Sequence, residues 1–163
     1  MLTPVAISAY DVVLAVHIMA VVAAFGVTFA YPIMFSVAVK HSPTSIPVLH
    51  RIEYTVARLL INPLLVVVVA AGVYLASDGK HWSEFFVQWG LAAAIVIGAL
   101  VGSVMIPASK KAEALATRDL AATGSGPAAI SDEYRAVVRR ITVVGSLLSG
   151  LVLLTVLFMA IQP

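Results

Sequence analysis

The sequence predicts an all-α integral membrane protein, a four-helix bundle with both termini on the outer side. Three observations predict this class. The 163 residues are 61% hydrophobic and only 11% charged, which is too apolar for a soluble domain of this size. Four apolar runs are each long enough for a hydrocarbon core about 30 Å thick, which a helix of roughly 20 residues crosses. Nine of the ten Lys and Arg residues lie in two segments between these runs, Lys40–Arg58 and Ser109–Arg140.

The four apolar runs are Val12–Val39, Leu59–Ala76, Phe85–Ala108 and Ile141–Ile161. Backbone polar groups find no water in lipid, so each run is expected to be helical. The runs lack the two-residue alternation of a β-barrel strand. With polar extensions on the cytoplasmic side, we expect a single domain, 1–163, with helices at about 9–40, 46–77, 83–118 and 132–161.

Helix starts and one linker are also visible in the sequence. Ser45 precedes Ile-Pro, and Ser131 precedes two acidic residues; both patterns are typical of helix N-termini. The stretch 121–129 (AATGSGPAA) contains small residues and no charge, so we expect the linker there. Pro63 cannot donate a hydrogen bond to the carbonyl of Leu59, which predicts a kink or a local widening of the second helix.

The distribution of basic residues predicts the orientation. Lys80 alone lies between the second and third runs, and no basic residue precedes the first run or follows the last. Because cytoplasmic loops carry the excess of Lys and Arg, the two basic segments are expected in the cytoplasm. We therefore expect a multi-pass membrane protein, whose basic residues mark topology and do not indicate a nucleic-acid partner.

The two halves of the chain share a weak pattern. A proline lies near the cytoplasmic end of the first and third runs, and a Glu-Tyr pair follows in each basic segment, at Glu53-Tyr54 and Glu133-Tyr134. Two explanations fit: a parallel repeat of two helical hairpins, or features that all membrane hairpins share.

A stripe of small residues follows one face of the third helix. Gly90, Ala94, Gly98 and Gly102 recur every four residues, and such stripes let a second helix backbone approach closely. Packing inside the bundle and a homo-oligomer interface both agree with this pattern.

His17 is the main candidate for chemistry. It lies about two turns inside the first helix and shares a face with Tyr10, Ala24 and Tyr31 at seven-residue spacing. An ionisable residue inside a membrane helix is by default a candidate functional site. The alternative is a neutral histidine that bonds to a neighbouring hydroxyl or carbonyl.

The stretch from His17 to Pro32, HIMAVVAAFGVTFAYP, resembles the first helix of small four-helix membrane proteins related to copper-resistance protein D and to the haem-associated protoporphyrinogen oxidase of bacteria. It is similar to a bacterial family known only as predicted integral membrane proteins of unknown function. The resemblance implies haem b held by His17 as axial iron ligand. Relatives with oxidase activity have a basic residue and further histidines in the bundle, whereas the third run here has no Lys or His. No catalytic residue is therefore carried over.

Two further residues are weaker candidates for the second axial ligand. His81 lies in the outer loop and Met159 near the outer end of the fourth helix, and haem iron accepts either His/Met or His alone. Imidazole and thioether groups would also suit Cu(I), but no Met-rich motif is present. With no cysteine in the chain, disulfides, thiolate metal sites and covalent haem attachment are excluded.

The sequence thus leaves two functions open. One is a small inner-membrane protein that binds haem b through His17. The other is an oligomeric pore, a small-solute carrier or an accessory subunit of a membrane complex, without cofactor. Whether the protein is an enzyme stays undecided, since no nucleotide loop, nucleophile elbow or zinc-binding helix motif occurs.

Overall fold

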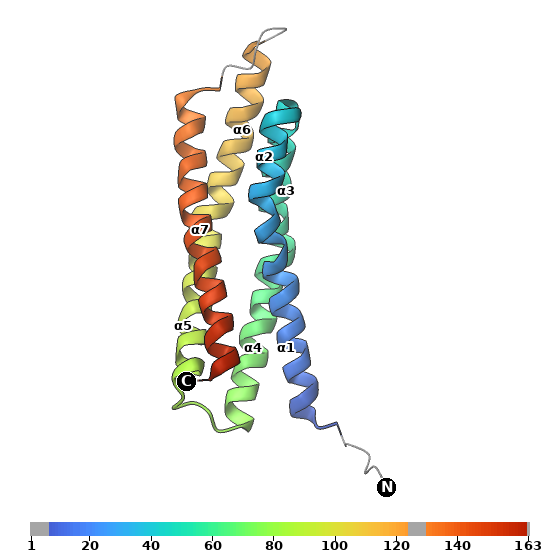
Figure 1. Cartoon of the computed structure of the whole chain (residues 1–163), viewed down its shortest axis with the longest axis vertical. Coiled ribbons are helices and arrows are strands. Elements are labelled where there is room, and N and C mark those ends of the chain that lie inside the picture. Colours follow the sequence, from blue (N-terminus) through green and yellow to red (C-terminus); the bar gives the residue numbers. More distant parts are fainter. Residues whose placement is uncertain (1–6, 124–129, 163) are drawn as a thin grey trace.

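The computed structural model describes residues 7–123 and 130–162, and within these ranges the chain forms helices and no strands. Four long helices lie side by side and alternate in direction (Figure 1). The all-α prediction is thus confirmed for the described part of the chain. The structure divides these helices into α1 (Ala9–Phe25), η1 (Gly26–Ala30), α2 (Tyr31–His41), η2 (Pro43–Ser45), α3 (Ile46–Val56), η3 (Ala57–Ile61), α4 (Asn62–Asp78), α5 (Phe85–Leu100), η4 (Val101–Met105), α6 (Ile106–Thr123) and α7 (Asp132–Ile161).

All four helices are long and apolar enough to cross a membrane, which is consistent with a multi-pass membrane protein. They contain 33, 36, 38 and 30 residues. At 1.5 Å per residue even the shortest is about 45 Å long, whereas the hydrocarbon core is about 30 Å thick. Each helix is therefore longer than the hydrocarbon layer is thick.

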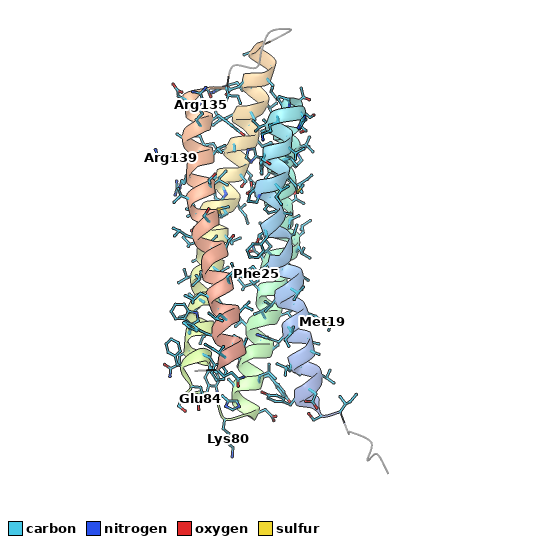
Figure 2. The ribbon with its side chains drawn as sticks, in the orientation of Figure 1. Met19, Phe25, Lys80, Glu84, Arg135 and Arg139 are labelled. Carbon is cyan, nitrogen blue, oxygen red and sulfur yellow. The ribbon has the colours of Figure 1, made fainter. Side chains whose placement is uncertain are left out.

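The outer surface is largely apolar, as expected for contact with lipid. Met19 on α1 is 61% exposed, whereas Phe25 on the same helix lies in the core (Figure 2). Many other large apolar side chains along the four helices are exposed in the same way. A soluble protein rarely leaves so much contiguous apolar surface uncovered.

The helices pack in two levels. In one half of the molecule, the half that contains the chain ends, α1 packs along α4 and α5 packs along α7. In the other half, α3 packs along α6, which also packs against the start of α7. Each level has its own buried core. The first includes Phe25, Ile61, Ile97 and Leu148, and the second includes Ile46, Ala112, Leu115 and Ile141.

Three of the four helices leave α-helical geometry where the two levels meet. A 3₁₀ turn, η1, ends two residues before Pro32. Two π turns, η3 and η4, end two residues before Pro63 and Pro107. Proline lacks the backbone donor for the carbonyl four residues earlier, and its ring crowds that carbonyl, so the preceding turn changes its hydrogen bonding. The local widening predicted at Pro63 is present.

Helix ends agree only in part with the sequence patterns. Ser131 caps α7 by accepting a hydrogen bond from the backbone N–H of Tyr134. Ser45 precedes α3, but its hydroxyl donates to the carbonyl of Ser42 and does not cap the helix. The third helix continues to Thr123, beyond the expected end at 118. Residues 121–123 of the predicted linker are therefore helical, and 124–129 lie outside the described residues.

Candidate functional site

A cavity of about 460 Å³ lies among α1, α4, α5 and α7. This volume is in the range of small-molecule and cofactor pockets. Most of its wall is aliphatic or aromatic, and the polar side chains on it are few. His17 lines this cavity, as does Met159. Phe25 and Leu65 of the first core form its inner end.

The His17 ring is held by the neighbouring helix. Its Nδ1 lies 2.9 Å from the backbone carbonyl oxygen of Val68 in α4. A carbonyl only accepts hydrogen bonds, so Nδ1 carries the proton and donates. In the neutral imidazole the lone pair is then on Nε2, which has no hydrogen-bond partner in the described part of the chain.

Gly72 leaves room for this ring. A Cβ atom added at Gly72 would lie 3.4 Å from Cε1 of His17. Alanine would therefore just fit, whereas any larger side chain would meet the imidazole. Gly72 lies one helical turn after Val68. Because Gly72 has no side chain, the His17 ring can reach the Val68 carbonyl.

These residues fit a single imidazole–iron bond to haem. A ligating histidine usually donates its second ring N–H to a carbonyl or carboxylate, which fixes the orientation of the ring; here that acceptor is Val68. The apolar wall also suits an apolar macrocycle. Among the described residues, no group of three or more His, Cys, Asp or Glu side chains could hold a bare metal ion.

The two weaker candidates lie in different places. Met159 on α7 lines the cavity, but its methyl group packs against Gly90 and occupies the space that a side chain there would need. His81 does not line the cavity. It lies in the turn after α4, where its ring packs against Gly79 and contacts Phe86 at 6.1 Å between ring centroids.

The small-residue stripe on the third helix has mixed surroundings. Gly90 packs against Met159, and a Cβ at Gly98 would lie 3.1 Å from Leu65. Gly102, in contrast, is exposed, and an added Cβ there would meet nothing within 4 Å.

A group of buried polar side chains lies in the half of the molecule where α3 packs against α6 and the start of α7. His50 and Glu53 of α3, Ser109 of α6 and Tyr134 of α7 are all buried. His50 Nδ1 is 3.3 Å from Glu53 Oε2, and the Ser109 hydroxyl donates to the same oxygen at 2.9 Å. The Tyr134 hydroxyl lies 3.0 Å from His50 Nε2. We call these four residues the buried polar cluster; it joins three helices from both halves of the sequence.

The directions of these hydrogen bonds follow from the chemistry of the groups. Burial, together with the Glu53 carboxylate, raises the pKa of Tyr134 to about 12, so its hydroxyl stays protonated. In the neutral imidazole with its proton on Nδ1, His50 Nε2 accepts from this hydroxyl. His50 Nδ1–H then donates to Glu53, which only accepts.

The Tyr31 hydroxyl is also buried and has no partner within the described residues.

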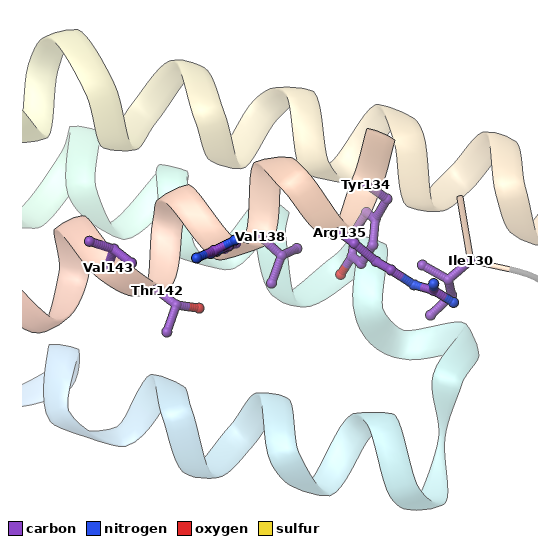
Figure 3. Close-up of a pocket in the computed structure, with 7 residues that line it drawn as sticks. Ile130, Tyr134, Arg135, Val138, Thr142 and Val143 are labelled. Atoms are coloured by element: carbon purple, nitrogen blue, oxygen red, sulfur yellow. The ribbon is translucent and has the colours of Figure 1, made fainter. Parts of the chain in front are cut away.

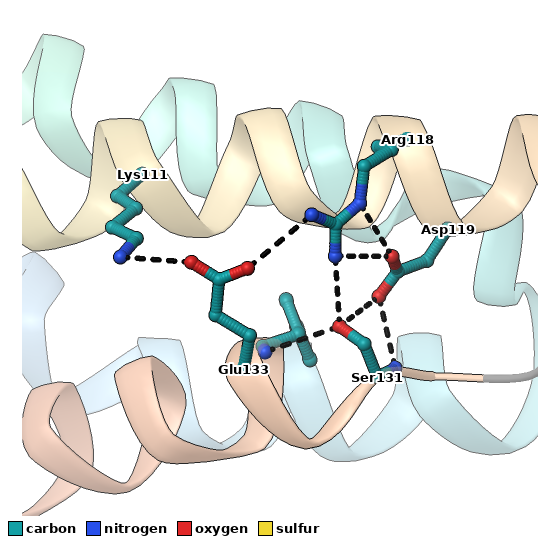
Figure 4. A network of polar contacts seen from close by, with 6 residues as sticks. Lys111, Arg118, Asp119, Ser131 and Glu133 are labelled. Atoms are coloured by element: carbon teal, nitrogen blue, oxygen red, sulfur yellow. Dashed lines mark hydrogen bonds and ion pairs between the residues drawn. The ribbon is translucent and has the colours of Figure 1, made fainter.

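A separate network of ion pairs and hydrogen bonds fixes α6 to the start of α7 (Figure 4). Glu133 accepts from Lys111 at 3.0 Å and from Arg118 at 3.2 Å. Asp119 accepts from the Ser131 backbone N–H at 2.9 Å and also pairs with Arg118. Hydrogen bonds from Ser131 lower the pKa of Asp119, and the hydrogen bond from Lys111 lowers that of Glu133. Both carboxylates therefore stay ionised at neutral pH and hold these segments together.

The sequence did not reveal the buried polar cluster. The Glu-Tyr pairs were visible, but their members have different surroundings: the Glu53 side chain is 9% exposed, whereas the Glu133 side chain is 48% exposed. A charged residue on the apolar face of the amphipathic segment 46–56 was the available signal. That signal names Glu53, but not the partners from α6 and α7.

Comparison with known protein families, with curated proteins and with solved structures finds no match for this chain. The class is therefore defined by the structure alone: an all-helical chain with four helices able to span a membrane.

Proposed function

We propose that the chain is a small polytopic protein of the bacterial cytoplasmic membrane that binds haem b in the α1–α4–α5–α7 cavity, with His17 as an axial ligand. The observation that carries this proposal is the His17 ring, which lines an apolar cavity, is fixed by Val68 through Nδ1, and has no hydrogen-bond partner for Nε2 among the described residues. The resemblance of the segment His17–Pro32 to haem-associated membrane proteins supports it further.

The proposed topology places this cavity in the outer half of a four-helix bundle. Both basic segments would face the cytoplasm, together with the buried polar cluster. The cavity, near both chain ends, would then lie toward the outer surface. The bound haem would supply one-electron chemistry, and the aliphatic wall would limit the access of water to it. Met159 is the candidate for the second axial ligand, because it shares the cavity wall with His17.

The test is the absorption spectrum of the full-length protein, purified in mild detergent from haem-replete cells, before and after reduction with dithionite. A Soret band and sharp reduced α and β bands, at about one haem per chain, are expected. His17→Ala should lose these bands. His41→Ala is the matched control, since His41 is exposed at the end of α2, and it should keep them. A spectrum unchanged in His17→Ala, or a wild-type protein that stays colourless after hemin addition, would overturn the proposal.

A second variant keeps His17 but fills the space beside its ring. Gly72→Leu would place a side chain against the His17 ring, so it should also abolish haem binding. Gly150→Leu is the control, because a Cβ at Gly150 meets nothing within 4 Å. Equal haem content in both variants would argue against this cavity as the haem site.

The cofactor-free alternative, an oligomeric pore, carrier or accessory subunit, is favoured by one observation. Gly102 continues the small-residue stripe of Gly90, Ala94 and Gly98, but faces open space, as a helix-contact position in an oligomer would. Cysteine at Gly102 should form an intermolecular disulfide in membranes, and cysteine at Gly98, which packs against Leu65, should not. If neither position crosslinks, this stripe is not an interface between copies.

A further inference from the structure

An open groove of about 640 Å³ lies along the first turns of α7 (Figure 3). Its lining combines two cations, Arg135 and Arg139, with the apolar side chains of Val138 and Val143. The groove is separate from the haem cavity, with which it shares no lining residue.

Arg135 and Arg139 are one helical turn apart, so they lie on the same face of α7. Arg135 makes one ion pair, with Asp132 at 3.2 Å, and both side chains of that pair are exposed. Such exposed pairs are weak, so Arg135 stays available to another anion. Arg139 makes no ion pair with any described residue.

This differs from the other cations near α6. Arg51 pairs with Glu113 at 2.7 Å, and Arg118 pairs with both Asp119 and Glu133. Apart from Asp132, which makes the exposed pair with Arg135, the carboxylates near this groove pair with cations outside it. The groove keeps an excess of positive charge that the described part of the chain does not neutralise.

The groove also changes polarity along the helix axis. Arg135 is toward the start of α7, and Thr142 and Val143 are toward the apolar run that begins at Ile141 (Figure 3). If α7 crosses a membrane with its apolar run, the cationic part lies at the edge of the hydrocarbon layer and the apolar part lies inside it. An occupant must have a negative group at one end and a hydrocarbon part at the other.

We propose that this groove is a binding site for an anionic phospholipid. The phosphate group would lie between the guanidinium groups of Arg135 and Arg139, and an acyl chain would lie on Val138 and Val143. Guanidinium groups bind phosphate oxygens through paired, charge-assisted hydrogen bonds. The aliphatic floor favours a lipid over a soluble phosphate, and the net positive charge favours an anionic lipid over a zwitterionic one.

The test uses the full-length protein in nanodiscs made of phosphatidylcholine with increasing fractions of phosphatidylglycerol. The readout is the number of phosphatidylglycerol molecules retained per protein after transfer to detergent, measured by native mass spectrometry. Arg139→Gln should lower the apparent affinity for phosphatidylglycerol about fivefold, as expected for one cation at an anionic membrane surface. Arg58→Gln is the matched control, since Arg58 is an exposed arginine without an ion pair in the described residues and lies outside the groove.

Each outcome of this experiment either supports or overturns the proposed lipid site. Loss of bound phosphatidylglycerol in Arg139→Gln but not in Arg58→Gln supports the site, provided that the melting temperatures without lipid are equal. Equal losses in both variants would show a diffuse surface attraction and overturn the proposal. Equal retention of phosphatidylcholine and phosphatidylglycerol by the wild type would overturn it as well. Displacement of the lipid by millimolar inorganic phosphate would identify a soluble phosphate as the ligand and exclude a lipid site.

Discussion

Glu53→Ala is expected to destabilise the protein by about 3 kcal/mol, because it removes a buried carboxylate that accepts two hydrogen bonds. The Glu53 carboxylate accepts from His50 and from Ser109, and all three groups are buried. Removing the acceptor leaves two donors unsatisfied away from water. Since the cluster joins α3, α6 and α7, the loss should separate these helices in the half of the molecule away from the chain ends. Thermal unfolding in a fixed detergent, followed by circular dichroism, measures the effect.

Glu113→Ala is the matched control for this variant. Glu113 pairs with Arg51, whose side chain is 69% exposed, and exposed pairs contribute about 0–1 kcal/mol. Glu53→Gln removes the charge but keeps a hydrogen-bond acceptor, because the amide oxygen still accepts from Ser109. Glu53→Gln should therefore lose less stability than Glu53→Ala. If Glu53→Ala melted no earlier than Glu113→Ala, the buried polar cluster would have no structural role.

Ala112→Leu should have the second largest effect, through steric conflict. Ala112 on α6 is fully buried, in the core formed with Ile46, Leu115 and Ile141. Three additional carbon atoms have no space there, and overpacking a core costs about 1–3 kcal/mol. Because α3 and α6 are closely packed at this level, we expect the two helices to move apart. The melting temperature should fall, and amide exchange in α3 should increase.

The control for this variant is Ala114→Leu on the same helix. Ala114 is exposed, so the same substitution adds no steric conflict, and leucine forms helices nearly as well as alanine. Similar melting temperatures for the two variants would contradict the packing found around Ala112.

The four helices were predictable because lipid leaves the backbone little choice. An apolar run of about 20 residues must satisfy its own hydrogen bonds, and only a helix does so locally. Val12–Val39 and Ile141–Ile161 therefore identify their helices without knowledge of tertiary contacts. Helix ends were less certain. Ser45 has the residue type of a cap, but its hydroxyl bonds to the carbonyl of Ser42.

The candidate sites were predictable only where one residue carries the signal. His17 is conspicuous because an imidazole is rare within an apolar run, and the structure places it on a cavity wall. Its acceptor, the Val68 carbonyl, carries no sequence signal, because every residue has one. The buried polar cluster depends on Ser109 and Tyr134, which are ordinary residue types and are 56 and 84 positions from their partners. Only the packing of α3 against α6 and α7 brings them together.

The two π turns have a consequence for comparing this chain with others. A π turn accommodates one more residue than the α turn it replaces, and one residue corresponds to about 100° of rotation around a helix. The inward-facing positions before η3 or η4 are therefore out of phase with those after it. A relative that lacked the extra residue could keep both packed levels, and the correct alignment would then place a one-residue gap within Ala57–Ile61 or Val101–Met105. Aligned without that gap, inward-facing residues of the two chains would correspond on one side of the π turn. On the other side, inward-facing residues of one chain would be matched with lipid-facing residues of the other.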